Sequence, residues 1–285
     1  MAGIFGFFDY TKPGPGIPKD APPKPRIVVF FGILQRKFWN LIKINMLFML
    51  FNLPAIIGML FASTFVFDQN VNDPLGDLIV RFAFGLFFIA IPVITVGPAQ
   101  AGFTYILRNY AREEHAFLWW DFKDTALKNF KQSIIISIID FAVMIVAGIS
   151  MRFYFHKITE NSIWSFPAGL VIVAFDVFLM MHLYIYPMLI TFKLTVKQIY
   201  KNALIFAFIK LIPNALILLL CFAIVFATFL NYLIGIILLI FITYSLIGLI
   251  TNFYVNPIIK KYMIDKFNEN AGNEKSESGV EEGSK

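Results

Sequence analysis

The chain has 285 residues, of which 59% are hydrophobic and 15% are charged, and its formal net charge is +6. Soluble globular domains average about 25% charged and 45–50% apolar residues, so this composition excludes an ordinary soluble domain and predicts a membrane protein. The basic residues are spread through short segments between apolar runs, which argues against nucleic acid as a partner. The single cysteine, Cys221, excludes a disulfide framework and a cysteine-based metal site.

The chain begins with a polar arm. Residues 11–25 form a linker rich in Pro, Gly and Lys, and residues 26–40 follow as an amphipathic helix. In this helix Arg36, Lys37 and Trp39 suit the level of the lipid headgroups. We therefore expect residues 1–40 to form a cytoplasmic arm with an amphipathic helix. The first apolar run is long enough to span a membrane, so we expect no cleaved signal peptide.

Six apolar runs are each long enough, at about 17–25 residues, to cross a hydrocarbon core of about 30 Å. Only Asn231 and Tyr232 separate the last two, which predicts a tight hairpin. The runs cover residues 41–66, 78–96, 132–153, 166–190, 213–230 and 232–256. The sequence thus predicts an all-α polytopic membrane protein with about six transmembrane helices in one domain over residues 41–256, with interfacial cytoplasmic helices at 98–131 and 191–212.

Lys and Arg residues are concentrated on one predicted side of the membrane. They lie in the arm, in segments 97–131 and 191–212, and in the tail, whereas the opposite loops carry only Arg81, Arg152 and Lys157. Because cytoplasmic loops carry the excess of basic residues, both termini should be cytoplasmic. Residues 257–285 are then a cytoplasmic polar tail.

Three amphipathic stretches lead directly into odd-numbered spans. They cover residues 35–45, 126–136 and 203–214, and each contains a Phe and a Lys. One interpretation is three repeated units, each an amphipathic helix followed by a helical hairpin. The alternative is that each inner-side helix entry independently selects an aromatic residue and a Lys.

Three ionisable residues lie inside predicted spans, namely Asp140 in the third and Asp176 and His182 in the fourth. Such residues are costly in lipid and usually face other helices. Asp140 and His182 each lie about eight residues from the cytoplasmic side, or roughly 12 Å deep, so they can be neighbours. Asp176 lies about 9 Å further out. The functional interpretation is a polar relay or substrate contact; the structural one is a hydrogen-bonded pair, or a protonated Asp held by a neighbouring carbonyl.

The segment 92–132 is the most polar part of the chain between spans. It opens with Pro92, Gly97 and Pro98, and we expect it to turn onto the membrane surface as two amphipathic helices. These helices would present a cytoplasmic docking surface; a plain membrane-surface spacer is the alternative. The candidate docking residues are Arg108, Arg112, Glu113, Glu114, Trp119, Trp120, Asp121 and Lys123.

Enzyme signatures are missing from the sequence. It has no nucleophile elbow, zinc-protease motif or nucleotide-binding loop, and its three histidines lie in separate segments. We therefore expect a protein that is not an enzyme, with no catalytic residue, cofactor or bound metal.

Three stretches carry a family resemblance: F-F-D-Y-T-K-P-G-P-G-I at 7–17, R-K-F-W-N-L-I-K-I-N at 36–45, and P-V-I-T-V-G-P-A-Q-A-G-F-T-Y-I-L-R-N-Y-A-R-E-E-H-A-F-L-W-W-D-F-K at 92–123. The chain resembles the YesL family of bacterial integral membrane proteins. The resemblance implies a multi-pass protein of the bacterial cell membrane. Members are typically encoded beside carbohydrate ABC importers and glycan-degrading enzymes, which implies a link to sugar uptake but no mechanism.

Two functions remain open at this point. The first is a non-enzymatic accessory or regulatory subunit that binds the subunits of a carbohydrate ABC importer. The alternative is a secondary transporter or channel with a polar path through spans three and four, lined by the three intramembrane ionisable residues.

Overall fold

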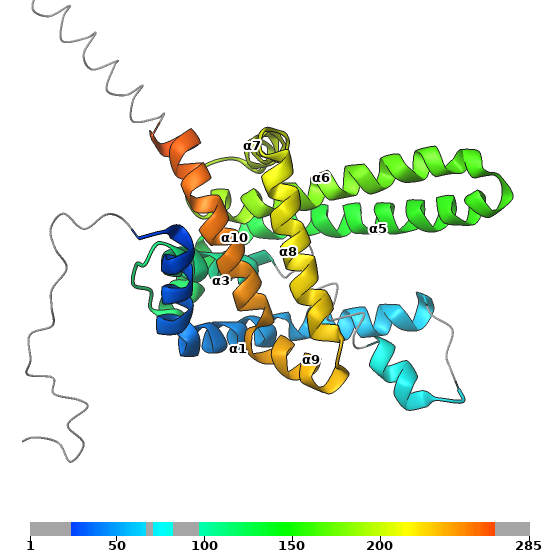
Figure 1. Cartoon of the computed structure of the whole chain (residues 1–285), viewed down its shortest axis with the longest axis horizontal. Helices are drawn as coiled ribbons and strands as arrows, with labels where there is room; N and C mark the ends of the chain where they lie inside the picture. The colour runs from blue at the N-terminus through cyan, green and yellow to red at the C-terminus, as the bar shows by residue number, and fades with distance from the viewer. Residues whose placement is uncertain (1–23, 67–70, 82–96, 266–285) are drawn as a thin grey trace, which may run out of the picture.

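The computed structural model describes residues 24–66, 71–81 and 97–265, and these residues contain helices joined by short turns (Figure 1). No strand occurs among them. The α-helices are α1 (Arg26–Val66), α3 (Gly97–Ala111), α4 (Leu118–Lys128), α5 (Phe130–Glu160), α6 (Ser165–Leu189), α7 (Val196–Ile209), α8 (Leu211–Phe229), α9 (Tyr232–Leu238) and α10 (Tyr244–Ile259). Two π-helical segments, Leu239–Thr243 and Lys260–Asp265, continue α9 and α10.

Five helical stretches in the described residues are long and apolar enough to cross a membrane. They are Arg26–Gly58, Phe130–Glu160, Ser162–Leu189, Leu211–Phe229 and Leu233–Asp265. They correspond to the first, third, fourth, fifth and sixth predicted spans, and the chain is an all-α polytopic membrane protein. Most of the second predicted span, 78–96, lies outside the described residues, and its first residues, 78–81, are helical.

The predicted division near residue 40 is not a break in the structure. The amphipathic helix and the first span form one continuous helix, α1, from Arg26 to Val66. Between Ile33 and Leu53 the sequence contains no Gly or Pro that would interrupt the hydrogen-bond ladder, which explains the continuity.

This continuity also distinguishes the first predicted repeat from the other two. In those, a short helix ends just before its span, at Asn129 between α4 and α5 and at Lys210 between α7 and α8.

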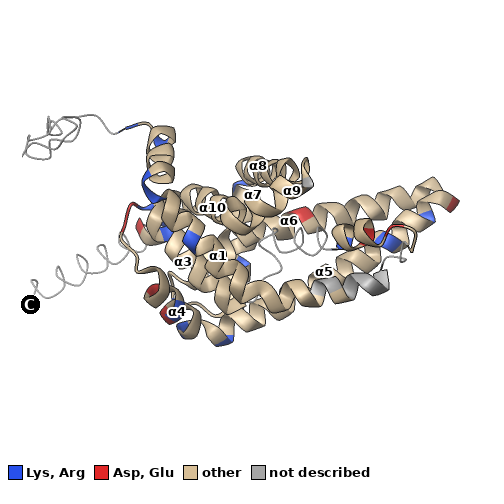
Figure 2. Ribbon diagram, turned by 90° about the horizontal axis from the view of Figure 1, so that it is seen from below, with Lys and Arg blue, Asp and Glu red and all other residues tan. Residues whose placement is uncertain are grey.

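The helices do not form a parallel bundle. Helices α8 and α10 cross the α5–α6 hairpin steeply, and the outer part of this hairpin projects beyond the other described helices (Figure 1). Exposed apolar side chains occur along both helices of this hairpin, as expected for a surface in contact with lipid; they include Phe141, Val146, Ile149, Phe166 and Val173. Charged residues gather toward the two ends of the molecule, with few between (Figure 2).

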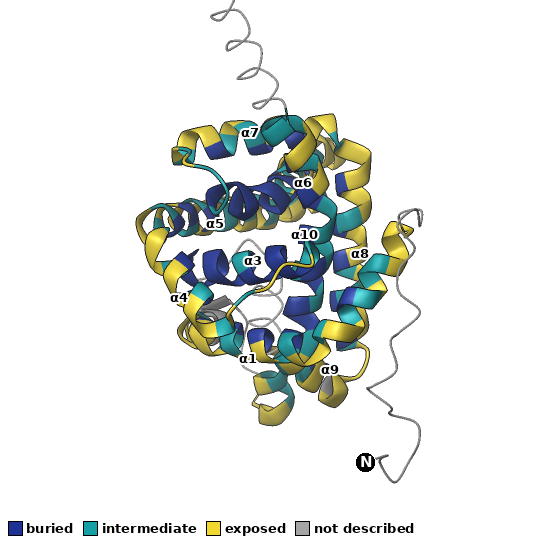
Figure 3. Cartoon of the chain, turned by 90° about the vertical axis from the view of Figure 1, so that its left-hand side faces the viewer, coloured by how far each residue is buried: buried dark blue, intermediate teal, exposed yellow. Residues whose placement is uncertain are grey.

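Helix α3 lies inside the protein, which corrects the prediction that this part of segment 98–131 is an interfacial helix. Thirteen of its fifteen residues are buried, and it packs against α1, α4, α5, α6 and α10 (Figure 3). Small residues allow this close packing. A Cβ atom added at Gly102 would lie 2.6 Å from the carbonyl oxygen of Phe122 on α4, and one at Gly248 on α10 would lie 2.3 Å from Leu107.

The last two spans are joined by the predicted tight turn. Helix α8 ends at Phe229, and the side chain of Asn231 accepts a hydrogen bond from the Ile234 N–H to start α9. Further on, the π-helical segment Leu239–Thr243 packs against α1. The Asn45 amide donates to the carbonyls of Leu239 and Ile240 at 2.8 and 2.7 Å and accepts from the Ser245 N–H at 2.8 Å. One side chain of α1 thus satisfies the irregular backbone of its neighbour, as membrane proteins require.

The contact at Gly102 gives a test of the buried position of α3. We expect Gly102→Ala to lower the free energy of unfolding by about 1–3 kcal/mol, because the added methyl group overlaps the α4 backbone. The measurement is unfolding of the purified protein in SDS, followed by circular dichroism. Gly148→Ala on α5 is the matched control, since an added Cβ there meets no atom within 4 Å. Equal stability of the two variants would contradict the packing described.

Candidate functional site

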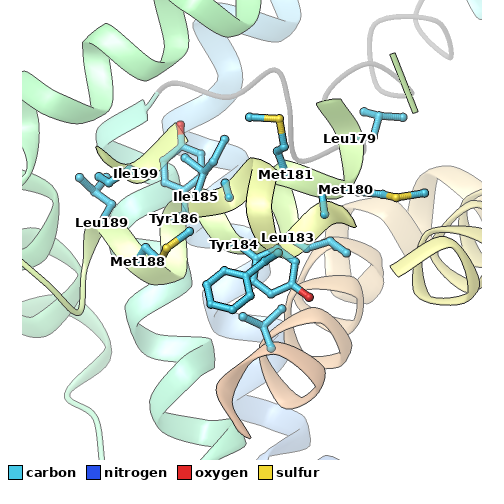
Figure 4. Packing of buried hydrophobic residues seen from close by; sticks show 14 of the residues in the cluster. Leu179, Met180, Met181, Leu183, Tyr184, Ile185, Tyr186, Met188, Leu189 and Ile199 are labelled. Carbon is cyan, nitrogen blue, oxygen red and sulfur yellow. The ribbon is translucent and has the colours of Figure 1, made fainter. Parts of the chain in front are cut away.

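The C-terminal half of α6 is the longest unbroken run of buried residues in the described part of the chain. Every residue from Phe178 to Leu189 is buried, with α3, α5, α7, α8 and α10 packed around it. In Figure 4 the labelled hydrophobic side chains of this stretch point to different sides of the helix, and they belong to one cluster of buried hydrophobic residues. A polar side chain on this stretch must therefore find its partner inside the protein.

Asp140 and His182 form such an internal pair. His182 is 3% exposed on α6 and Asp140 is 1% exposed on α5. The distance from His182 Nε2 to Asp140 Oδ1 is 2.8 Å. The structure thus brings together the two residues that their equal depth in adjacent antiparallel spans predicted to be neighbours.

The second ring nitrogen of His182 fixes the proton content of the pair. His182 Nδ1 lies 2.9 Å from the carbonyl oxygen of Phe178, and because a carbonyl only accepts, Nδ1 must carry a hydrogen. One proton then lies between Nε2 and Oδ1. The pair is neutral overall whichever of the two atoms holds that proton, and a neutral pair is tolerated in a low-dielectric interior.

Tyr200 on α7 is a third member of the site that sequence reasoning missed. Its hydroxyl donates to the same Asp140 Oδ1 at 2.9 Å. Burial, and then the nearby Asp140 charge, raises the pKa of Tyr200, so the hydroxyl remains a donor.

Helix α7 is placed by polar contacts at both of its ends. At the start, Thr195 and Gln198 form a capping box. At the end, the Asn214 amide donates to the carbonyls of Phe206 and Ala207 at 3.1 and 3.3 Å. Nothing in the sequence pattern of α7 marks Tyr200, because its role depends on a helix 60 residues away.

The other carboxylate oxygen of Asp140 has no hydrogen-bond partner in the described part of the protein, although it is buried. An unpaired buried acceptor typically costs about 1–3 kcal/mol. The arrangement holds one shared proton and leaves an acceptor available for a further donor. The Asp140–His182–Tyr200 site could therefore exchange a proton or hold a polar group.

Asp176 does not belong to this site. It precedes His182 by nearly two turns of α6 and lies on an exposed face of the α5–α6 hairpin. The expectation of a polar set containing all three ionisable residues is thus corrected: the structure joins Asp140 to His182 and Tyr200, and it leaves Asp176 on the outside.

The predicted docking residues of α4 lie at the surface. Trp119 and Trp120 are 47% and 65% exposed, and the Lys123 amine lies 5.9 Å from the centre of the Trp120 ring. Asp121 has a local task, because its carboxylate accepts a hydrogen bond from the Phe117 N–H at 2.8 Å. The structure therefore presents an exposed aromatic surface on α4, and a hydrogen bond within the same segment holds the start of this helix.

Arg108 is not part of that surface, which corrects its placement among the docking residues. Its side chain is buried and donates to Thr191 Oγ1 at 2.9 Å, just beyond the C-terminal end of α6. Its guanidinium lies 4.9 Å from the centre of the Tyr105 ring. Burial, and then the nearby positive charge of Arg112, lowers the pKa of Arg108 to about 10.

The three remaining docking candidates form the turn after α3. Glu113 has a left-handed backbone with φ of 60°, and the N–H groups of Glu113 and Glu114 bond to the carbonyls of Tyr110 and Asn109. This is a Schellman ending, in which Gly is usual. Here the Glu113 side chain forms an ion pair with Arg36 on α1. Arg112 and Glu114 line a pocket beside the C-terminal end of α10.

Within the described ranges, no group of three or more His, Cys, Asp or Glu side chains is arranged to hold a metal ion. His115 and His156 lie apart from His182. His115 contacts the ring of Phe117, and His156 lies near Glu160 at the tip of the α5–α6 hairpin.

The Asp140–His182 contact predicts non-additive stability effects. His182→Leu should lower the free energy of unfolding by about 3–5 kcal/mol, because it leaves the Asp140 carboxylate buried without its main partner. The double variant Asp140→Leu/His182→Leu should be more stable than His182→Leu alone. Asp176→Asn, which removes an exposed carboxylate of the same hairpin, should have little effect. Additive losses in SDS unfolding would argue against a coupled pair.

Comparison with known proteins identifies the family of the central segment. Residues 41–151 match the family described as "Protein of unknown function, DUF624". Comparisons with curated proteins and with solved structures gave no match. This family is the YesL-like group of membrane proteins, and the matched segment contains α1 from Leu41 onward, α3, α4 and the Asp140 half of the polar site. Residues 41–151 thus match the model of the YesL-like membrane protein family, which confirms the resemblance over this segment.

Proposed function

We propose that the protein is a non-enzymatic accessory subunit of the bacterial cell membrane that binds a carbohydrate ABC importer through the exposed face of α4. The observation that carries the proposal is the pair of exposed tryptophans, Trp119 and Trp120, on a helix whose other face is anchored in the core. Tryptophan is enriched among the residues that dominate binding energy at protein interfaces.

The α4 surface is fixed before any partner binds. Phe122 is buried against α3, where Gly102 allows the two helices to touch. Asp121 holds the start of the helix through the Phe117 N–H. Because the surface does not have to be ordered on binding, less conformational entropy is lost.

The charges on α4 favour a protein partner over an anionic lipid surface. Asp121 and Asp124 balance Lys123 and Lys128, and Lys128 lies 3.9 Å from Asp124. A helix without net charge is not attracted to anionic headgroups, which recruit basic segments. The importer is the partner that the family resemblance implies, and the excess of Lys and Arg in this segment and in both terminal segments supports a cytoplasmic location for α4 and for both ends of the chain.

A second candidate function rests on a different observation. The unpartnered Asp140 oxygen beside a shared proton is a feature of proton-coupled secondary transporters and channels as much as of a structural pair. In that case Asp140, His182 and Tyr200 would line the path.

Trp120→Ala tests the proposed importer contact. Loss of a central interface tryptophan typically weakens binding by at least about 2 kcal/mol, or roughly 30-fold. We therefore expect the variant to lose copurification with the importer subunits that the wild-type chain retains. Phe141→Ala is the matched control, because Phe141 is 51% exposed on the projecting hairpin and lies outside α4.

Two outcomes would contradict the accessory role. One is undiminished recovery of importer subunits with Trp120→Ala. The other is solute flux driven by a proton gradient in proteoliposomes that contain this chain alone, abolished by Asp140→Asn, which would favour the transporter function instead.

A further inference from the structure

A pocket of about 450 Å³ lies between the turn after α3 and the end of α10. It shares no residue with the Asp140–His182–Tyr200 site or with α4. It is lined by Arg112, Glu114, Asn256, Pro257, Lys260 and Ile264. Lys260 begins the π-helical segment that continues α10, and Arg112 is the residue directly after α3. The pocket thus lies between the C-terminal ends of α3 and α10.

The side chains that line this pocket carry an excess of positive charge. Arg112 and Lys260 supply two positive charges, and Glu114 supplies one negative charge. Among the described residues, neither cation forms an ion pair within 4 Å. Arg112 is also not required to cap α3, because the backbone N–H groups of Glu113 and Glu114 already satisfy the carbonyls of Tyr110 and Asn109.

Asn256 provides an independent indication of a ligand. Its side chain is 9% exposed, and its amide nitrogen has no acceptor in the parts of the chain that the structure describes. A buried donor without a partner is destabilising, so a ligand oxygen that accepts from this amide would bind favourably here.

We propose that this pocket binds a phosphate group. Its three donor groups differ in kind, comprising a planar guanidinium, an ammonium and an amide, and together they suit a ligand with several acceptor oxygens and negative charge. Pro257 and Ile264 give the pocket an apolar side, which fits the glycerol and acyl part of an anionic phospholipid. A lipid headgroup and free phosphate share the recognised chemistry, and experiment can separate them.

Glu114 gives the proposal a test in which the sign of the change in affinity is predicted. Its carboxylate lines the same pocket and repels an anionic ligand, so its removal should strengthen binding. A purely structural role for these charges predicts no such gain.

The experiment uses the purified full-length protein in a non-ionic detergent. The probes are dioctanoyl phosphatidylglycerol, inorganic phosphate, and dioctanoylglycerol as the analogue without phosphate. The readout is a saturable rise in the thermal unfolding temperature, followed by intrinsic fluorescence and fitted to an apparent Kd.

We expect saturable stabilisation by phosphatidylglycerol and none by dioctanoylglycerol. Arg112→Gln and Lys260→Gln should each weaken it about fivefold, the effect of one basic residue at an anionic headgroup. Glu114→Gln should strengthen it. Lys261→Gln is the matched control, because it removes the same charge from the neighbouring position, which does not line the pocket.

Stabilisation by phosphatidylglycerol but not by inorganic phosphate supports a lipid ligand, and stabilisation by inorganic phosphate supports a free phosphate ligand. The proposal is overturned if neither probe gives saturable stabilisation, or if Lys261→Gln weakens binding as much as Lys260→Gln. These results do not involve α4 or the importer, so this proposal can fail while the proposed function stands.

Discussion

Helix α3 is buried on nearly all sides, so each polar side chain that it carries must be satisfied within the protein. The most demanding of these is Arg108, whose charged group is placed beside Thr191 Oγ1 and the Ile190 carbonyl at the end of α6. A cation at this position also suits the negative end of the α6 dipole. The burial of α3 and the position of α6 therefore depend on each other.

This dependence extends to the polar site. Arg108 fixes the C-terminal end of α6, and His182 lies two turns earlier on the same helix, facing Asp140 on α5. Tyr200 reaches the pair from α7, which Asn214 holds against the start of α8. The contacts of α3 with α5 and α6 thus help to place a buried acid, a base and a hydroxyl that come from three helices.

Several features could be predicted from the sequence because they depend on local pattern. Span lengths follow from apolar runs, and the Asp140–His182 contact follows from equal depth in antiparallel helices. Arg108 could not be placed, because an arginine on an amphipathic helix looks like a surface residue and its partners lie 82 and 83 residues away. Tyr200 cannot be found from the sequence either, because its partner Asp140 lies 60 residues away. The sequence cannot separate Asp176 from the pair, because depth alone does not show which face of a helix a residue occupies.

Cysteine accessibility tests the internal position of α3 most directly. In a Cys221→Ser background, Thr104→Cys places a thiol of similar size at a position on α3 that is 3% exposed, and Lys123→Cys places one on the exposed face of α4. Both would be treated with a charged maleimide in inside-out membrane vesicles. We predict that Lys123→Cys is labelled rapidly and that Thr104→Cys is labelled only after SDS unfolding. Equal labelling rates in native membranes would contradict the structure described.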